Sequence, residues 1–146
     1  MPEERRELGF QIKCVNNMIR RKIDIRFAAA GLEELVGMQG PVLGYIHGES
    51  LNRDVFQRDV EKAFNIRRST ATVLLQNLEQ KGYIVRQPVS SDGRLKKIVM
   101  TEKAVQHHLA IWREIEAFNR ELEDGISPEE KELFLRILDK VKKNLE

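Results

Sequence analysis

Hydrophobic residues recur every three to four positions along most of the chain, a spacing typical of one face of an α-helix. It predicts helices over residues ~6–29, ~39–47, ~56–63, ~67–80, ~102–123 and ~128–145. The first helix has a second apolar set beside its main stripe, so it needs more than one packing partner. Gly48 is expected to end the second helix, and Ala63 to face inward beside Val60 in the third. Thr101 and Ser127 are expected to cap the last two helices.

The pattern changes between residues 83 and 100. Tyr83 to Arg86 and Leu95 to Met100 are predicted to be strands, with a turn-rich segment from Pro88 to Gly93 between them. Two short helices, a tight turn, another helix and a hairpin form a winged helix-turn-helix. The expected fold class is therefore mainly α with a small β-hairpin wing, flanked by N- and C-terminal dimerisation helices. The expected parts are an N-terminal dimerisation helix, a winged-helix DNA-binding lobe and C-terminal dimerisation helices, over residues 1–35, 36–101 and 102–146.

Composition limits the class of protein. The chain has 146 residues, 41% hydrophobic and 33% charged, which is enough to build a core. It contains no run of ~18 apolar residues and no apolar N-terminal segment, so neither a membrane helix nor a secretory signal is expected. A single cysteine excludes an internal disulfide framework. These features together predict a cytoplasmic protein with no membrane partner.

Charge is distributed unevenly along the chain. The net charge is only +2, but residues 66–100 hold seven Lys or Arg against two acidic residues, a local net charge of +5. A local basic block in a nearly neutral protein is the footprint expected for contact with phosphates. A solvated basic face is the alternative that charge alone leaves open.

Short polar and basic residues gather at the start and on the outward side of the helix predicted at ~67–80. They are Arg67, Arg68, Ser69, Thr70, Thr72, Val73 and Gln76. Arg can pair with guanine, Gln with adenine, and a Thr or Val methyl group can contact thymine in the major groove. The pattern favours a DNA-reading helix. Two other interpretations stay open, since Ser69 and Thr70 could cap the helix and the Arg pair could be solvated.

Residues ~56–101 resemble the winged helix-turn-helix of the MarR family of bacterial transcriptional regulators. The family's wing signature is Asp-x-Arg, five residues, then Leu-Thr; here Asp92-Gly93-Arg94 is followed after five residues by Met100-Thr101. Met in place of Leu is a mild departure. The segment from Leu78 to Arg86 also resembles the family's Leu-Glu-x-Lys-Gly-x-Ile-x-Arg run.

The resemblance implies a homodimeric repressor that binds a pseudo-palindromic, double-stranded operator. It implies that Arg94 reaches toward the minor groove, and we assign the basic residues Lys96 and Lys97 of the following strand to DNA as well. Asp92 is expected to orient the wing or Arg94, or to form the turn, because a carboxylate facing phosphate would be repelled. The terminal helices support a dimer independently, since a monomer would expose their apolar stripes.

The resemblance also implies a small-molecule effector of unknown identity between the dimerisation helices and the DNA-binding lobe. Candidate lining residues are Phe10, Tyr45, His47 and Trp112, although core packing explains each of them equally well. No other cofactor is expected.

Four other functions are disfavoured. Cys14 lies near the position of the reactive cysteine in the peroxide-sensing branch of the family, but no tyrosine accompanies it, and a buried structural cysteine is favoured. His107 and His108 point about 100° apart on a helix and do not chelate like an i, i+4 pair, so no metal site is expected. No phosphate loop, nucleophile elbow or paired-carboxylate motif indicates an enzyme, so no catalytic residue is assigned. A helical dimerisation module without a DNA function is also disfavoured, because it would lack the hairpin wing that carries Arg94.

Overall fold

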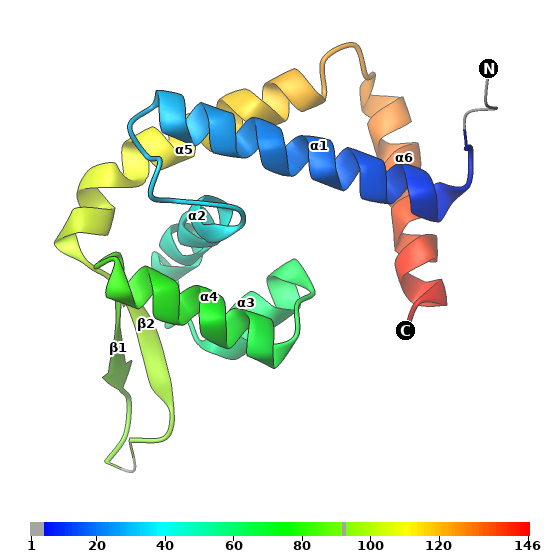
Figure 1. Ribbon diagram of the computed structural model, residues 1–146. Coiled ribbons are helices and arrows are strands. Elements are labelled where there is room, and N and C mark those ends of the chain that lie inside the picture. Colours follow the sequence, from blue (N-terminus) through cyan, green and yellow to red (C-terminus); the bar gives the residue numbers. More distant parts are fainter. Residues whose placement is uncertain (1–4, 92) are drawn as a thin grey trace. The chain divides into compact units, whose positions relative to one another are not determined.

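The computed structural model describes residues 5–91 and 93–146. The elements in this part of the chain are α1 (Leu8–Ala29), α2 (Gln39–Ser50), α3 (Gln57–Phe64), α4 (Arg68–Gln80), β1 (Ile84–Pro88), β2 (Lys96–Met100), α5 (Glu102–Leu122) and α6 (Pro128–Asn144) (Figure 1). The fold is mainly α with one antiparallel hairpin, as the sequence predicted. None of the described helices is long and apolar enough to cross a membrane.

The chain divides into two compact units after Ile115. The first unit holds α1 to α4, the hairpin and most of α5, and the second holds the end of α5 and α6. The sequence predicted a different division, by functional role rather than by compactness, into residues 1–35, 36–101 and 102–146. That division stays a prediction.

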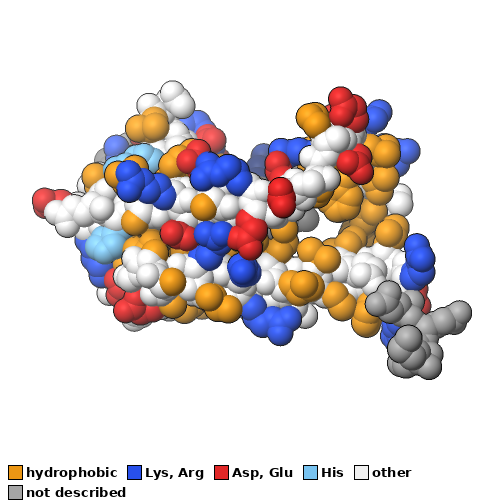
Figure 2. Space-filling view, turned by 90° about the horizontal axis from the view of Figure 1, so that it is seen from above, with side chains coloured by type: hydrophobic (Ala, Val, Ile, Leu, Met, Phe, Trp, Pro, Cys, Tyr) orange, Lys and Arg blue, Asp and Glu red, His pale blue; other side chains and the backbone are white. Residues whose placement is uncertain are grey.

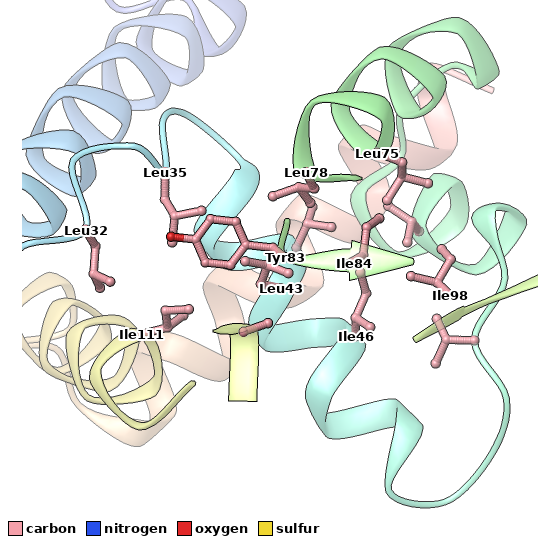
Figure 3. Close-up of a cluster of buried hydrophobic side chains, with 14 of the residues drawn as sticks. Leu32, Leu35, Leu43, Ile46, Leu75, Leu78, Tyr83, Ile84, Ile98 and Ile111 are labelled. Carbon is pink, nitrogen blue, oxygen red and sulfur yellow. The ribbon is translucent and has the colours of Figure 1, made fainter. Parts of the chain in front are cut away.

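The core of the first unit is built around α2. Its residues Val42, Leu43 and Ile46 are fully buried, because helical spacing places all three on neighbouring parts of the helix surface. Figure 3 shows side chains from α4, β1 and β2 converging on them, with the ring of Tyr83 in the same cluster. Burying each Leu or Ile side chain stabilises the fold by about 1.5–3 kcal/mol, so this cluster holds the hairpin and α4 against α2.

The last part of α1 packs closely on α2 because Gly40 has no side chain. Phe27 is only 2% exposed, and a Cβ atom at Gly40 would lie 1.7 Å from Phe27 Cε2. The rest of α1 is largely exposed, including Leu8, Met18 and Ile25. Figure 2 shows hydrophobic side chains among charged ones on one face of the molecule. The prediction that α1 carries more apolar surface than one partner can cover therefore agrees with its burial.

Polar contacts fix the C-terminal end of α4. Lys81 Nζ donates a hydrogen bond to Gln39 Oε1 at 2.8 Å and another to the carbonyl oxygen of Glu34. Lys103 Nζ lies 2.9 Å from Glu34 Oε1, and the hydroxyl of Tyr83 donates to the same carboxylate. Burial and the neighbouring Glu34 carboxylate raise the pKa of Tyr83, so it stays a neutral donor. These bonds fix α4 relative to α2 and α5.

The hairpin is tied to the rest of the lobe by one further backbone bond. Arg86 pairs with Ile98 in the antiparallel register, and Ile98 N–H donates to the carbonyl oxygen of Val55 at 2.7 Å. Pro88 was predicted to lie in the turn, but it is the last residue of β1, opposite Lys96. Proline is tolerated there because a strand end need not donate to the ladder.

Both predicted caps are confirmed. Ala104 N–H donates to Thr101 Oγ1 at 3.3 Å. Glu130 N–H donates to Ser127 Oγ at 3.1 Å, and Ser127 N–H donates back to Glu130 Oε1 at 3.0 Å. Such a reciprocal pair satisfies two backbone donors that a helix start leaves open.

Two further local predictions were wrong. α2 continues through Gly48 to Ser50, because glycine costs only about 1 kcal/mol inside a helix and Gly48 keeps a helical conformation. Val60 of α3 is buried as predicted, but Ala63 is exposed. The neighbouring Phe64 packs against the core instead, since its larger side chain gains more from burial.

Candidate nucleic-acid interface

The orientation of α4 follows from its buried residues. Ala71, Leu75 and Leu78 are fully buried, so at 100° per residue the opposite face carries Ser69, Val73 and Gln76. All three of these are exposed, and Val73 is 57% exposed. The outward face therefore presents a hydroxyl, a methyl-bearing side chain and an amide, which suit base edges.

The turn before α4 is set by Asn65, which adopts a left-handed conformation with φ 49°. Asparagine is one of the few non-glycine residues that adopts this conformation readily. The chain then enters α4 with Arg67 as the extended N-cap residue, and both Arg67 and Arg68 are exposed there. Two arginines consequently lie at the start of the exposed helix.

The start of α3 is anchored to α2 by Arg53. Its guanidinium lies 3.0 Å from Glu49 and 3.1 Å from Asp59, and Asp59 also accepts a 2.8 Å hydrogen bond from Phe56 N–H. Partial burial favours the neutral form of Asp59, but the Phe56 N–H bond and Arg53 outweigh burial and hold the pKa of Asp59 below its ordinary value. Tyr45 adds its hydroxyl to the same cluster, 3.4 Å from Arg53.

Gln57 connects α3, α4 and the hairpin. Its Nε2 donates to Thr72 Oγ1 at 2.9 Å, and its Oε1 accepts from Arg86 Nη1 at 3.4 Å. Thr72 Oγ1 in turn donates to the carbonyl oxygen of Arg68 at 2.8 Å. Arg86 Nε also lies 3.4 Å from the carboxylate of Glu79, near the other end of α4. β1 is thus joined to α4 at two places, through Gln57 at Thr72 and directly at Glu79.

A groove of ≈ 480 Å³ lies between α3, α4 and the hairpin, and we call it the wing groove. It is lined by Phe56, Gln57, Arg58, Glu61, Arg68, Thr72, Arg86, Arg94, Leu95 and Lys96. Five of these ten residues are basic and one is acidic, so the groove attracts anions such as phosphate.

The wing contributes Arg94 and Lys96 to this groove. Lys97 follows on the opposite face of β2, because side chains alternate along a strand, and its Nζ lies 3.8 Å from Asp54 Oδ1. Asp92 lies outside the described residues, so its predicted role in orienting the wing stays a prediction.

The arrangement of helices, hairpin and basic groove matches known proteins. Residues 35–95 match the model of the MarR family. The transcription regulator MarR from Oenococcus oeni PSU-1 is 30% identical, with 94% of this chain and 99% of that chain covered and a TM-score of 0.79. The chain belongs to the MarR family. It is a winged-helix transcriptional regulator, as its motifs predicted.

Two further relatives of this MarR-family protein cover nearly the whole chain. The HTH-type transcriptional regulator YybA of Bacillus subtilis (strain 168) is 26% identical over 139 residues, which are 90% of this chain and 91% of YybA. A putative MarR-family transcriptional regulator from Listeria monocytogenes, solved in complex with a 26mer DNA, is 25% identical. Its TM-score is 0.77, with 97% of this chain and 90% of that chain covered.

Sequence reasoning missed three residues of the wing groove whose side chains can donate hydrogen bonds, namely Gln57, Arg58 and Arg86. Gln57 and Arg58 belong to α3, which was interpreted only through its apolar residues. Arg86 lies in the Leu78 to Arg86 run that carries the resemblance, so the run itself was the available signal. Ser69, Thr70 and Val73 do not line the wing groove and lie instead at a cleft on the other flank of α4.

The four candidate effector residues do not share one cavity. His47 and Trp112 line a cavity of ≈ 10 Å³, which has room for no more than about one water molecule. Tyr45 packs edge-on against Phe64 at 5.7 Å, and Phe10 lies under Arg5; neither lines that cavity.

The cysteine and the histidines were the remaining candidates for a sensor site. Cys14 is partly buried in α1. His47 stacks on His108 with ring centroids 4.5 Å apart, whereas His107 lies edge-on to Tyr83 at 5.9 Å. No group of three or more His, Cys, Asp or Glu in the described part of the chain is arranged to hold a metal ion.

Proposed function

We propose that this MarR-family protein binds a double-stranded DNA operator through α4 and the hairpin wing. The observation that carries the proposal is the wing groove, where five basic side chains from α3, α4 and the hairpin line one concave surface with a single acidic residue. The DNA complex of the Listeria monocytogenes relative supports it. Basic side chains that neutralise phosphates release counterions, which makes such binding depend on salt.

Each element has a distinct role in this proposal. Ser69, Val73 and Gln76 contact base edges in the major groove, because they face outward from α4. Arg94 reaches the minor groove from the wing. The other predicted DNA residues contact the phosphate backbone or position the helix: Arg67, Arg68, Thr70, Thr72, Lys96 and Lys97. Phosphate contacts set the register of the protein on the duplex, and base contacts select the sequence.

A homodimer is the second part of the proposal. No residue of α6 is fully buried, and Leu133, Phe134 and Ile137 are 53%, 59% and 41% exposed. In α1, Leu8 and Met18 are also more than half exposed. A second copy of the chain would cover both stripes. A two-fold symmetric dimer would present two recognition helices to a pseudo-palindromic operator.

The regulatory part of the proposal rests on the family. We propose a cytoplasmic repressor whose operator affinity changes when a small molecule binds. The effector must favour one conformation of the dimer over another, since a ligand with equal affinity for both shifts nothing.

The test begins with a duplex library of random sequence, from which the protein selects its preferred site. Affinity for the selected duplex is then measured between about 50 and 200 mM salt. With ~6 phosphate contacts per dimer, the log–log slope should be roughly −5. A slope of log affinity against log salt concentration near zero on the selected duplex would overturn the DNA-binding proposal. Sedimentation should give about twice the chain mass of 17.0 kDa, and a well-behaved monomer would contradict the dimer.

A further inference from the structure

α4 has a second concave surface on the flank opposite the wing groove, and we call it the α1 cleft. It measures ≈ 700 Å³ and lies between α4, the middle of α1 and the segment that joins α1 to α2. Arg20 and Asn16 line it from α1, and Thr70 and Asn77 line it from α4. Gly37 N–H donates to Asp24 Oδ1 at 2.9 Å, which holds the joining segment against α1.

The width of the DNA major groove places a sugar–phosphate strand beside each flank of α4. The major groove of B-DNA is about 12 Å wide, and a helix with its side chains is about 10–12 Å across. A recognition helix therefore fills the groove and has one sugar–phosphate strand on each side. The wing groove accepts one strand with its five basic residues. The other strand must run along the opposite flank of α4, which is the α1 cleft.

The chemistry of the cleft suits that strand. Arg20 is its one charged lining residue, and no lining residue is acidic. The amides of Asn16 and Asn77 and the hydroxyl of Thr70 add hydrogen-bond donors for phosphate oxygens. The cleft is also continuous with the outward face of α4, because Ser69 and Val73 border it.

We infer that Arg20, supported by Asn16 and Asn77, binds the phosphate backbone of the second DNA strand. The inference rests on the proposed function, because it assumes that α4 enters the major groove. It gives α1 a role in DNA binding beside its expected role in dimerisation. Movement of α1 would then alter a DNA contact directly.

A pair of adjacent arginines provides the test. Arg20→Ala removes the cleft cation, and Arg21→Ala removes the same charge from a neighbouring exposed residue that does not line the cleft. Both variants change the long-range field about equally. On the duplex selected by the wild-type protein, Arg20→Ala should lower affinity roughly tenfold or more through two lost charge-assisted contacts per dimer. Its salt slope should be shallower by about 2, from about 0.9 per lost phosphate contact. Arg21→Ala should stay within about twofold of the wild type, as surface charges do at moderate salt.

The outcomes separate the inference from the proposed function. If Arg20→Ala matches Arg21→Ala while the wild type keeps its steep slope, the cleft does not bind DNA and the proposed function stands. A wild-type protein without salt-dependent binding overturns the proposed function itself. Sedimentation of each variant checks that the dimer persists.

A second variant covers the case in which Arg20→Ala disturbs α1. Asn77→Asp places a carboxylate in the cleft from α4, and like charge should weaken DNA binding by roughly tenfold. Asn52→Asp, on an exposed segment before α3, is its control. Equal affinities for the two Asp variants would overturn the inference.

Discussion

Gln57 Nε2 donates a hydrogen bond to Thr72 Oγ1 at 2.9 Å, while the Thr72 hydroxyl donates to the carbonyl oxygen of Arg68 at 2.8 Å. The one proton of the hydroxyl is therefore engaged within the protein. Gln57 also accepts from Arg86 on the wing strand at 3.4 Å. These hydrogen bonds indicate that Thr72 sets the angle between α4 and the wing and does not select a base.

Substitution of Thr72 should separate these two roles. Thr72→Val keeps the shape and removes the hydroxyl, so it should weaken binding to all sequences by about 2- to 10-fold, the worth of the one hydrogen bond that Gln57 donates to it. Thr72→Ser should bind like the wild type. Binding-site selection with each variant, at one fixed salt concentration, measures both the affinity and the preferred sequence. A loss of preference at one base position with Thr72→Val would show that Thr72 does read a base.

Arg94 and Gln76 should behave differently from each other. Arg94→Ala should weaken binding to most sequences in similar proportion, apart from a preference for narrow A·T-rich minor grooves. Gln76→Ala should relax preference at particular positions, by ~1–3 kcal/mol for a lost base contact. The same selection experiment compares the two. Unchanged affinity for Arg94→Ala, or an unchanged preferred sequence for a weakened Gln76→Ala, contradicts this assignment.

The fold was largely predictable because its signals are local. Helix spacing, the caps at Thr101 and Ser127, and the change to strand residues after Gly82 all lie within a few positions of the elements that they define. Errors arose where tertiary packing decides. Whether Ala63 or Phe64 faces the core depends on which of them meets other elements.

The site was predictable only in part, for the same reason. Arg68 and Arg94 could be assigned because they lie in recognisable segments of a helix start and a wing. Arg58 joins them only because α3 packs beside α4, and no local pattern reports that contact. The α1 cleft is less predictable still, since Arg20 lies about 50 residues from the α4 residues that it faces.

Two glycines of α2 should respond oppositely to substitution by alanine. Gly40→Ala places a Cβ atom 1.7 Å from Phe27 Cε2, so α1 must move or the ring must leave the core. The free energy of unfolding should fall by about 1–3 kcal/mol or more. Gly48 has nothing within 4 Å of an added Cβ, and Gly48→Ala should raise stability by about 0.5–1 kcal/mol. Denaturant unfolding at one fixed protein concentration compares them, because dimer stability depends on concentration. A stable Gly40→Ala variant would show that α1 does not pack on α2 as described.

The stacked imidazoles of His47 and His108 should make stability depend on pH. Burial, and to a lesser extent the charge of His108, lowers the pKa of His47 below its ordinary value of 6.5. The unfolded chain therefore takes up a proton near pH 6.5 at a site that stays neutral in the folded protein. Because the unfolded state binds more protons in this range, the free energy of unfolding should fall as pH drops through 6.5. It should level off below the pKa that His47 has in the folded state.

His47→Gln removes this titration and should flatten the dependence on pH between about 7.5 and 5.5, measured by denaturant unfolding at several pH values. His108→Gln removes only the neighbouring charge, so much of the slope should remain, since burial is the larger cause of the lowered pKa of His47. If His47→Gln keeps the full wild-type slope, other groups carry the pH dependence. A slope that vanishes in both variants would instead mean that the charge of His108, rather than burial, dominates at His47.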